Sequence, residues 1–289
     1  MKKLAISVSG GGMLGIGPLH FMCRLENDYG IKVDAESVAF AGTSTGAIIA
    51  AMLADGHDAH EIFNLYKDNV KKIFTKYPLW KRILPKVPKY NNKNLKNMLK
   101  DNLKGKCGDW TKPVFIPATF MNGQSVEKVW DKGDADTDKW FAVLTSTAAP
   151  TYFDIIVDDE GRSFCDGGLW KNSPVTILNA GLNRSEYRGN VKILSFDTGM
   201  TTPNTASGNK TLLGWADYLI SDFVARSARS GDYEVKADIG ADNVFLASPV
   251  HDKKLPMDAT DDESVEAVIE IWDKYYDSVK AELDKFMAK

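Results

Sequence analysis

Residues 37–54, SVAFAGTSTGAIIAAMLA, contain the feature that decides the fold. An apolar run suited to a buried strand leads into the pentapeptide GTSTG at 42–46, and a second apolar run, Ala47–Ala54, is suited to a buried helix. In a G-x-S-x-G elbow, the glycines Gly42 and Gly46 allow a sharp turn that lifts a serine hydroxyl clear of a sheet at the start of a helix. The pattern predicts strand, turn and helix, with Ser44 as a candidate nucleophile. An ordinary Ser/Gly turn is the alternative.

A second glycine-rich turn, SGGGMLG at 9–15, follows the apolar strand expected at Leu4–Ser9 and precedes a stretch with helical spacing. It fits G-x-G-x-x-G through Gly10, Gly12 and Gly15, so a dinucleotide site is the competing interpretation. That site needs an acidic residue at the end of the second strand, whereas this strand ends in the residues FAG. Exposed backbone N–H groups beside a serine suit an oxyanion hole better.

A nucleophilic serine needs a base, and the four histidines offer a poor one. Only His251 follows the serine in the order typical of α/β-hydrolases, and an elbow after one earlier strand comes too soon for that fold. Asp166 follows a strand expected at residues 162–165, and its neighbours Gly167 and Gly168 would let its carboxylate approach another loop closely. A plain Asp-Gly turn without a chemical role is the alternative.

Taken in order, these motifs resemble the patatin-like phospholipases. The resemblance covers about residues 4–200 and rests on the motifs Gly10-Gly11-Gly12-x-x-Gly15, Gly42-x-Ser44-x-Gly46, Ser146-x-Ala148-Ala149-Pro150-x-Tyr152-Phe153, Asp166-Gly167-Gly168 with Asn172-x-Pro174, and LSFDTG at 194–199. It implies an α/β fold, a three-layer αβα sandwich with a mainly parallel central sheet, related to the catalytic domain of cytosolic phospholipase A.

The resemblance also implies a mechanism, that of a serine esterase with a Ser–Asp dyad and no histidine. Ser44 would be the nucleophile, Asp166 the proton acceptor, and the N–H groups of Gly10, Gly11 and Gly12 the oxyanion hole. The expected substrates are phospholipids or lysophospholipids, with no cofactor and no metal. The chain departs from the family in its glycine loop, where Ser9 and Leu14 replace the usual Asp and Arg or Lys. A regulatory or binding protein on this scaffold, with weak or gated activity, is the alternative function.

The charge of the chain is unevenly distributed. The formal net charge is -3, but residues 71–106 hold twelve Lys or Arg and one acid, a net of +11 that leaves -14 elsewhere. The near-neutral total argues against nucleic acid as a partner, while a basic segment with aromatic residues is typical of surfaces that dock anionic lipid. The candidate docking residues are Lys76, Trp80, Lys81, Arg82 and Lys86. A solvated Lys-rich loop that packs its aromatic residues on the core is the alternative.

The organisation expected from these patterns is a catalytic domain at 1–200, with the basic insertion 71–106 inside it, and a helical extension at 201–289 packed on the same domain. Further helices are expected near 58–74, 139–146, 212–224 and 265–283, and strands near 114–120, 124–130 and 191–197. The first apolar run is too short for a signal peptide, and no run approaches the ~18 residues of a membrane span. We therefore expect a cytoplasmic protein that contacts the inner face of a membrane peripherally; a homo-oligomer stays open.

Overall fold

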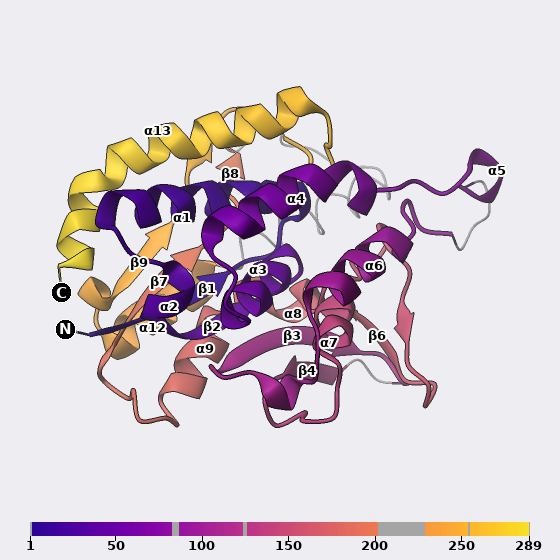
Figure 1. Cartoon of the computed structure of the whole chain (residues 1–289), viewed down its shortest axis with the longest axis horizontal. Coiled ribbons are helices and arrows are strands. Elements are labelled where there is room, and N and C mark those ends of the chain that lie inside the picture. The colour runs from indigo at the N-terminus through magenta and orange to yellow at the C-terminus, as the bar shows by residue number, and fades with distance from the viewer. Residues whose placement is uncertain (1, 83–86, 124–125, 202–228, 254, 289) are drawn as a thin grey trace, which may run out of the picture.

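The computed structural model describes residues 2–82, 87–123, 126–201, 229–253 and 255–288 (Figure 1). Its centre is an eight-stranded sheet in the order β5-β6-β3-β2-β1-β7-β9, with β4 paired to β3. Strands β3, β2, β1, β7 and β9 are mutually parallel, and β4, β6 and β5 add antiparallel pairs at one side. The strands are β1 Lys3–Val8, β2 Ser37–Gly42, β3 Val114–Phe120, β4 Val126–Trp130, β5 Ile156–Val157, β6 Ser163–Asp166, β7 Val191–Phe196 and β9 Val244–Ala247. A separate small sheet pairs β8, Met200–Thr201, with β10, Val250–His251.

Helices cover both faces of the large sheet. Side chains alternate along β1, so Leu4 and Ile6 join the core under α1, α3 and α13, whereas Ala5 joins the core under α9 and α12. The helices are α1 Ile16–Tyr29, α2 Val33–Glu36, α3 Thr45–Ala54, α4 Ala59–Ile73, α5 Leu79–Arg82, α6 Lys93–Asn102, α7 Lys139–Ser146, α8 Gly168–Lys171, α9 Val175–Leu182, α12 Arg229–Ile239 and α13 Asp262–Met287. Short 3-10 turns lie at Gly12–Gly15, Cys107–Asp109 and Ala241–Asn243. The arrangement confirms the three-layer αβα sandwich with a mainly parallel sheet.

Most of the elements expected from the sequence are present. The Asn122-Gly123 turn signal joins β3 to the antiparallel β4, and the capping residue Asp58 accepts a hydrogen bond from the Glu61 N–H at the start of α4. The helix expected at 212–224 lies outside the described residues. After residue 200 the chain supplies α12 and α13 and also β9, which pairs with β7 in the main sheet. The apolar run of β9 is only four residues long, which is too short for a clear period.

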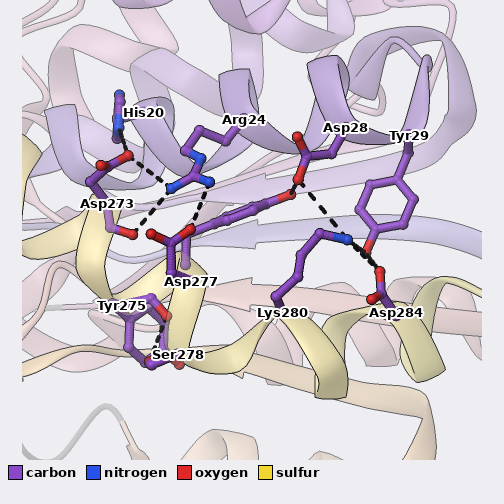
Figure 2. A network of polar contacts seen from close by, with 11 residues as sticks. His20, Arg24, Asp28, Tyr29, Asp273, Tyr275, Asp277, Ser278, Lys280 and Asp284 are labelled. Carbon is purple, nitrogen blue, oxygen red and sulfur yellow. Dashed lines mark hydrogen bonds and ion pairs between the residues drawn. The ribbon is translucent and has the colours of Figure 1, made fainter.

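Helices α1 and α13 lie side by side and are joined by aromatic packing and by a network of polar side chains (Figure 2). Arg24 donates to Asp273 at 2.9 Å and to Asp277 at 2.7 Å, and His20 Nε2 lies 3.0 Å from the Asp273 carboxylate. Beneath the network, Phe21 meets the ring of Trp272 edge to face, with ring centroids 6.1 Å apart. The C-terminal helix is therefore bound to the first helix of the fold.

Candidate active site

Ser44 stands at a strained turn between β2 and α3. Its backbone has φ 54° and ψ -122°, a region that non-glycine residues seldom occupy. Close packing enforces the turn, because a Cβ at Gly46 would lie 2.1 Å from the Val8 carbonyl oxygen and one at Gly42 would lie 1.9 Å from the Gly46 carbonyl oxygen. The strand, turn and helix predicted around the G-x-S-x-G motif are confirmed, and Ser44 is half-buried at the head of α3.

Strand β6 places Asp166, its last residue, near Ser44. β6 runs antiparallel to β3, and Asp166 pairs with Ala118, beyond the point where β2 pairs with the same strand. The Asp166 carboxylate accepts a hydrogen bond from the Gly168 N–H at 2.6 Å, and the Ser44 hydroxyl is close enough to lower the pKa of this carboxyl. Its backbone carbonyl accepts from the Thr119 hydroxyl at 2.9 Å, which fixes the residue in place.

Burial sets the ionisation of this carboxylate. Asp166 is 5% exposed, and desolvation raises its pKa from 3.8 to about 6 against the opposing effect of the bonds from Gly168 and Ser44. A carboxylate with a raised pKa is a stronger base, and at neutral pH it is still mainly ionised. The Asp166 carboxylate can therefore take a proton from a hydroxyl without the help of a histidine.

The glycine loop lies beside the elbow because β1 and β2 are neighbours and Val8 pairs with Gly42. The Gly10 N–H donates to the Asn172 carbonyl at 3.3 Å. Within the part of the chain that the structure describes, the N–H groups of Gly11 and Gly12 have no hydrogen-bond partner. These two are the donors that an oxyanion could use without displacing another bond.

Two further side chains hold the elbow in place. Neither was predicted as a site residue from the sequence. The Ser146 hydroxyl oxygen accepts from the Ser44 N–H at 3.0 Å, and the Thr43 hydroxyl donates to the Lys171 carbonyl at 2.8 Å. Ser146 stands in one of the family-like motifs, so that resemblance carried a signal for it. Thr43 carried none, because its partner is far away in the sequence.

Three of the four histidines have partners elsewhere. His20 contacts Asp273, His57 contacts Glu61, and His60 contacts Asn27. In the described ranges, no group of three or more His, Cys, Asp or Glu residues could hold a metal ion. Over the same ranges, no helix combines the length and the apolar character needed to span a bilayer.

The first half of the basic segment, residues 71–106, contains the short helix α5. This helix projects from one end of the molecule beyond the end of α4 (Figure 1). Leu79 is 77% exposed and Trp80 is 65% exposed, and the Lys81 ammonium lies 5.3 Å from the Trp80 ring centroid. Lys86 and the side chain of Arg82 lie outside what the structure describes.

Several lysines of residues 71–106 pair with acids from the rest of the chain. The pairs join Lys71 to Asp262, Lys89 to Asp258, and Lys106 to Asp138. They neutralise part of the +11 charge, so the unpaired charge is concentrated on fewer residues than the sequence count indicates.

The match to a known protein family agrees with this fold. The sequence matches the family described as patatin-like phospholipase over residues 6–179, which is more than half of the chain. The chain therefore belongs to the patatin-like phospholipase family, and the family places it among lipid hydrolases.

Several relatives carry the name cGAMP-activated phospholipase. The chain is 26% identical to one from Pseudomonas aeruginosa, a match that covers 91% of this chain and 82% of that protein. It is 30% identical to one from Escherichia coli over 60% of this chain and 53% of that protein, so it spans only about half of that relative's length. Among solved structures it is similar to VipD from Legionella pneumophila, with 15% identity, a TM-score of 0.48, and coverage of 96% of this chain and 67% of that one.

Proposed function

We propose that this protein hydrolyses fatty-acyl esters of phospholipids or lysophospholipids, with Ser44 as nucleophile and Asp166 as proton acceptor. The observation that carries the proposal is the pairing of a strained, half-buried serine with a buried carboxylate whose pKa is raised to about 6. Membership of the patatin-like family supplies the lipid substrate class.

The reaction proceeds in two balanced steps. Ser44 Oγ bonds to the ester carbonyl carbon as its proton passes to Asp166, and the carbonyl oxygen becomes an oxyanion facing the N–H groups of Gly11 and Gly12. The ester C–O bond then breaks, and the departing alcohol takes the proton from Asp166. Water attacks the acyl-enzyme with Asp166 as base, releasing the fatty acid and restoring Ser44. The start of α3 behind Ser44 favours the negative charge that develops.

Release of fatty acid from phospholipid and lysophospholipid vesicles by the purified chain tests the proposal. We expect Ser44→Ala to abolish release, because the other two hydroxyls of the elbow, those of Thr43 and Thr45, are bonded to the Lys171 carbonyl and to Tyr66. Ser278→Ala, on the exposed face of α13, is the matched control and should leave release unchanged. Release by Ser44→Ala at the wild-type rate would refute the proposal.

A hydrolase with gated activity, the alternative function, is tested separately, because several relatives are named cGAMP-activated phospholipases. The same assay is run with and without cGAMP. Release that requires cGAMP and is lost in Ser44→Ala would identify a gated hydrolase. Release that is equal in both arms would identify a constitutive one.

We also propose that α5 docks the enzyme peripherally on an anionic membrane. Leu79 and Trp80 are exposed apolar side chains beside Lys76 and Lys81, and a basic residue near an anionic bilayer contributes about 1 kcal/mol. Co-sedimentation with vesicles containing anionic lipid should weaken at least about tenfold in Leu79→Ala/Trp80→Ala/Lys81→Gln. Lys93→Gln/Lys100→Gln on α6 removes two charges elsewhere and should bind more nearly as wild type. Equal binding by both variants would exclude α5 as the docking element.

A further inference from the structure

A buried tyrosine connects the glycine loop to the serine elbow. Tyr66 lies on the core side of α4 and is 3% exposed. Its hydroxyl donates to the Gly12 carbonyl at 2.6 Å, and the Thr45 hydroxyl donates to the Tyr66 oxygen at 2.7 Å. The direction of this chain is fixed, because a carbonyl oxygen can only accept and the single tyrosine proton is therefore used at Gly12. Thr45 directly follows Ser44, so one side chain spans the two halves of the site.

The peptide between Gly12 and Met13 is held at both ends. Tyr66 binds its carbonyl, and its N–H donates to the Met257 carbonyl at 2.7 Å. Gly12 itself has φ 58°, so the direction of the chain at this residue depends on how that peptide is held. A shift of the Gly12 carbonyl would rotate Gly12, whose N–H is one of the two proposed oxyanion donors.

The other two carbonyls of the loop are also bound. The Gly10 carbonyl accepts from Asn172 Nδ2 at 3.3 Å and from the Thr198 hydroxyl at 3.4 Å, and the Gly11 carbonyl accepts from the Leu14 N–H at 3.2 Å. In a trans peptide the N–H points opposite to the carbonyl. Binding the Gly10 and Gly11 carbonyls therefore directs the N–H groups of the next residues, Gly11 and Gly12, away from these partners. Of the four hydrogen bonds to the carbonyls of Gly10, Gly11 and Gly12, the bond from Tyr66 to Gly12 is the shortest.

We propose that Tyr66 is a positioning residue, whose hydroxyl sets the place of the oxyanion donors relative to Ser44 by bonding the Gly12 carbonyl and Thr45 at once. The inference rests on the proposed function, because it concerns the same glycine loop. Tyr66 touches no reacting atom and acts through the backbone. Burial raises the pKa of Tyr66 to about 12, so the hydroxyl keeps its proton throughout the working range of pH.

Tyr66→Phe tests the inference, since it removes the hydroxyl and keeps the ring. Loss of one oxyanion-hole donor costs about 10²- to 10³-fold in kcat, and loss of a contact that positions two donors should cost about tenfold or more. We expect kcat and the rate of fluorophosphonate labelling to fall together while KM changes little. Thr45→Ser, which keeps the donor, should retain activity. Thr45→Val should lower kcat, and it should add little to Tyr66→Phe because both act through one chain of bonds.

Tyr275→Phe is the matched control. The Tyr275 hydroxyl also donates to a backbone carbonyl, that of Leu246, and accepts from the Ser248 N–H. Its loss should lower the thermal midpoint as Tyr66→Phe does, yet leave kcat unchanged. A folded Tyr66→Phe with wild-type kcat would overturn the inference. If the wild type neither reacts with fluorophosphonate nor releases fatty acid, the proposed function fails instead, and the two failures are distinct.

Discussion

Asp166, at the end of β6, and Asp273, on α13, are the same side chain in opposite surroundings. Asp166 is buried, its carboxylate accepts a hydrogen bond from the Gly168 N–H, and burial raises its pKa to about 6. Asp273 is half exposed, and its hydrogen bond with His20 and the charge of Arg24 lower its pKa (Figure 2). Asp166, which has no cationic partner, is suited to take a proton, whereas Asp273, which is paired with the Arg24 guanidinium, is suited only to join helices. The surroundings of each aspartate, rather than the residue type, decide whether its carboxylate is suited to catalysis or to holding the fold together.

The largest expected effect is on activity at Asp166. Asp166→Asn keeps the shape and the bond from Gly168 but cannot accept a proton from Ser44. Loss of a general base costs about 10²- to 10⁴-fold, so kcat for fatty-acid release should fall by that range. Asp273→Asn, the equivalent change on α13, should leave kcat unchanged. Equal losses at the two positions would remove the distinction drawn above.

The same Asp166→Asn variant should be more stable than the wild type above about pH 6. Because its folded-state pKa is raised, the wild-type carboxyl holds its proton more tightly when folded, and ionising it costs stability as pH rises from about 4 to about 6. Asparagine has no such cost. The gain should reach at most about 3 kcal/mol and vanish below about pH 4, as measured by denaturant unfolding across pH. A gain that instead grew as pH fell would contradict the raised pKa.

A smaller effect is expected where α1 meets α13. A Cβ at Gly17 would lie 2.0 Å from Trp272 Nε1, so Gly17→Ala overpacks this contact. Overpacking costs about 1 to 3 kcal/mol, and the better helix propensity of alanine offsets up to about 1 kcal/mol. We expect a net loss of about 1 to 2 kcal/mol in unfolding free energy, partly restored by Trp272→Phe. An unchanged thermal midpoint in Gly17→Ala would show that the two helices are not packed this closely.

The smallest effect is expected from Asp273→Asn on stability. Its ion pairs are half exposed, and such pairs contribute about 1 kcal/mol or less. Because its pKa is lowered in the folded state, the contribution is present above about pH 4 and is lost as pH falls through the folded value. High salt should reduce the difference from wild type. A loss well above 1 kcal/mol that salt does not change would mean that the α1–α13 network is not screened by solvent.

The sequence predicted an α/β fold and the two catalytic candidates from local patterns, and the three-layer arrangement from the order of motifs that resembles the family. The elbow at Ser44 needs its glycines within five residues, and Asp166 is marked by two glycines beside it. The role of Tyr66 could not be predicted, because a tyrosine on the apolar side of α4 has the pattern of ordinary core packing. Its partners Gly12 and Thr45 are defined only once the helix has packed.

The charge count was incomplete for the same reason. The +11 of residues 71–106 is a sum over the sequence, whereas the pairs Lys71–Asp262 and Lys89–Asp258 join residues more than 160 positions apart. Charge pairing of this kind depends on tertiary contacts that no local pattern contains. The membrane proposal therefore rests on α5 and its exposed side chains rather than on the total.

The rate of fluorophosphonate labelling across pH, with the adduct located by mass spectrometry of peptides, tests the central claim most directly. The account predicts an adduct on Ser44 whose rate of formation rises with pH through a midpoint near 6, and it predicts that Asp166→Asn reacts slowly with no such midpoint. An adduct on another residue, or the same midpoint in Asp166→Asn, would contradict it.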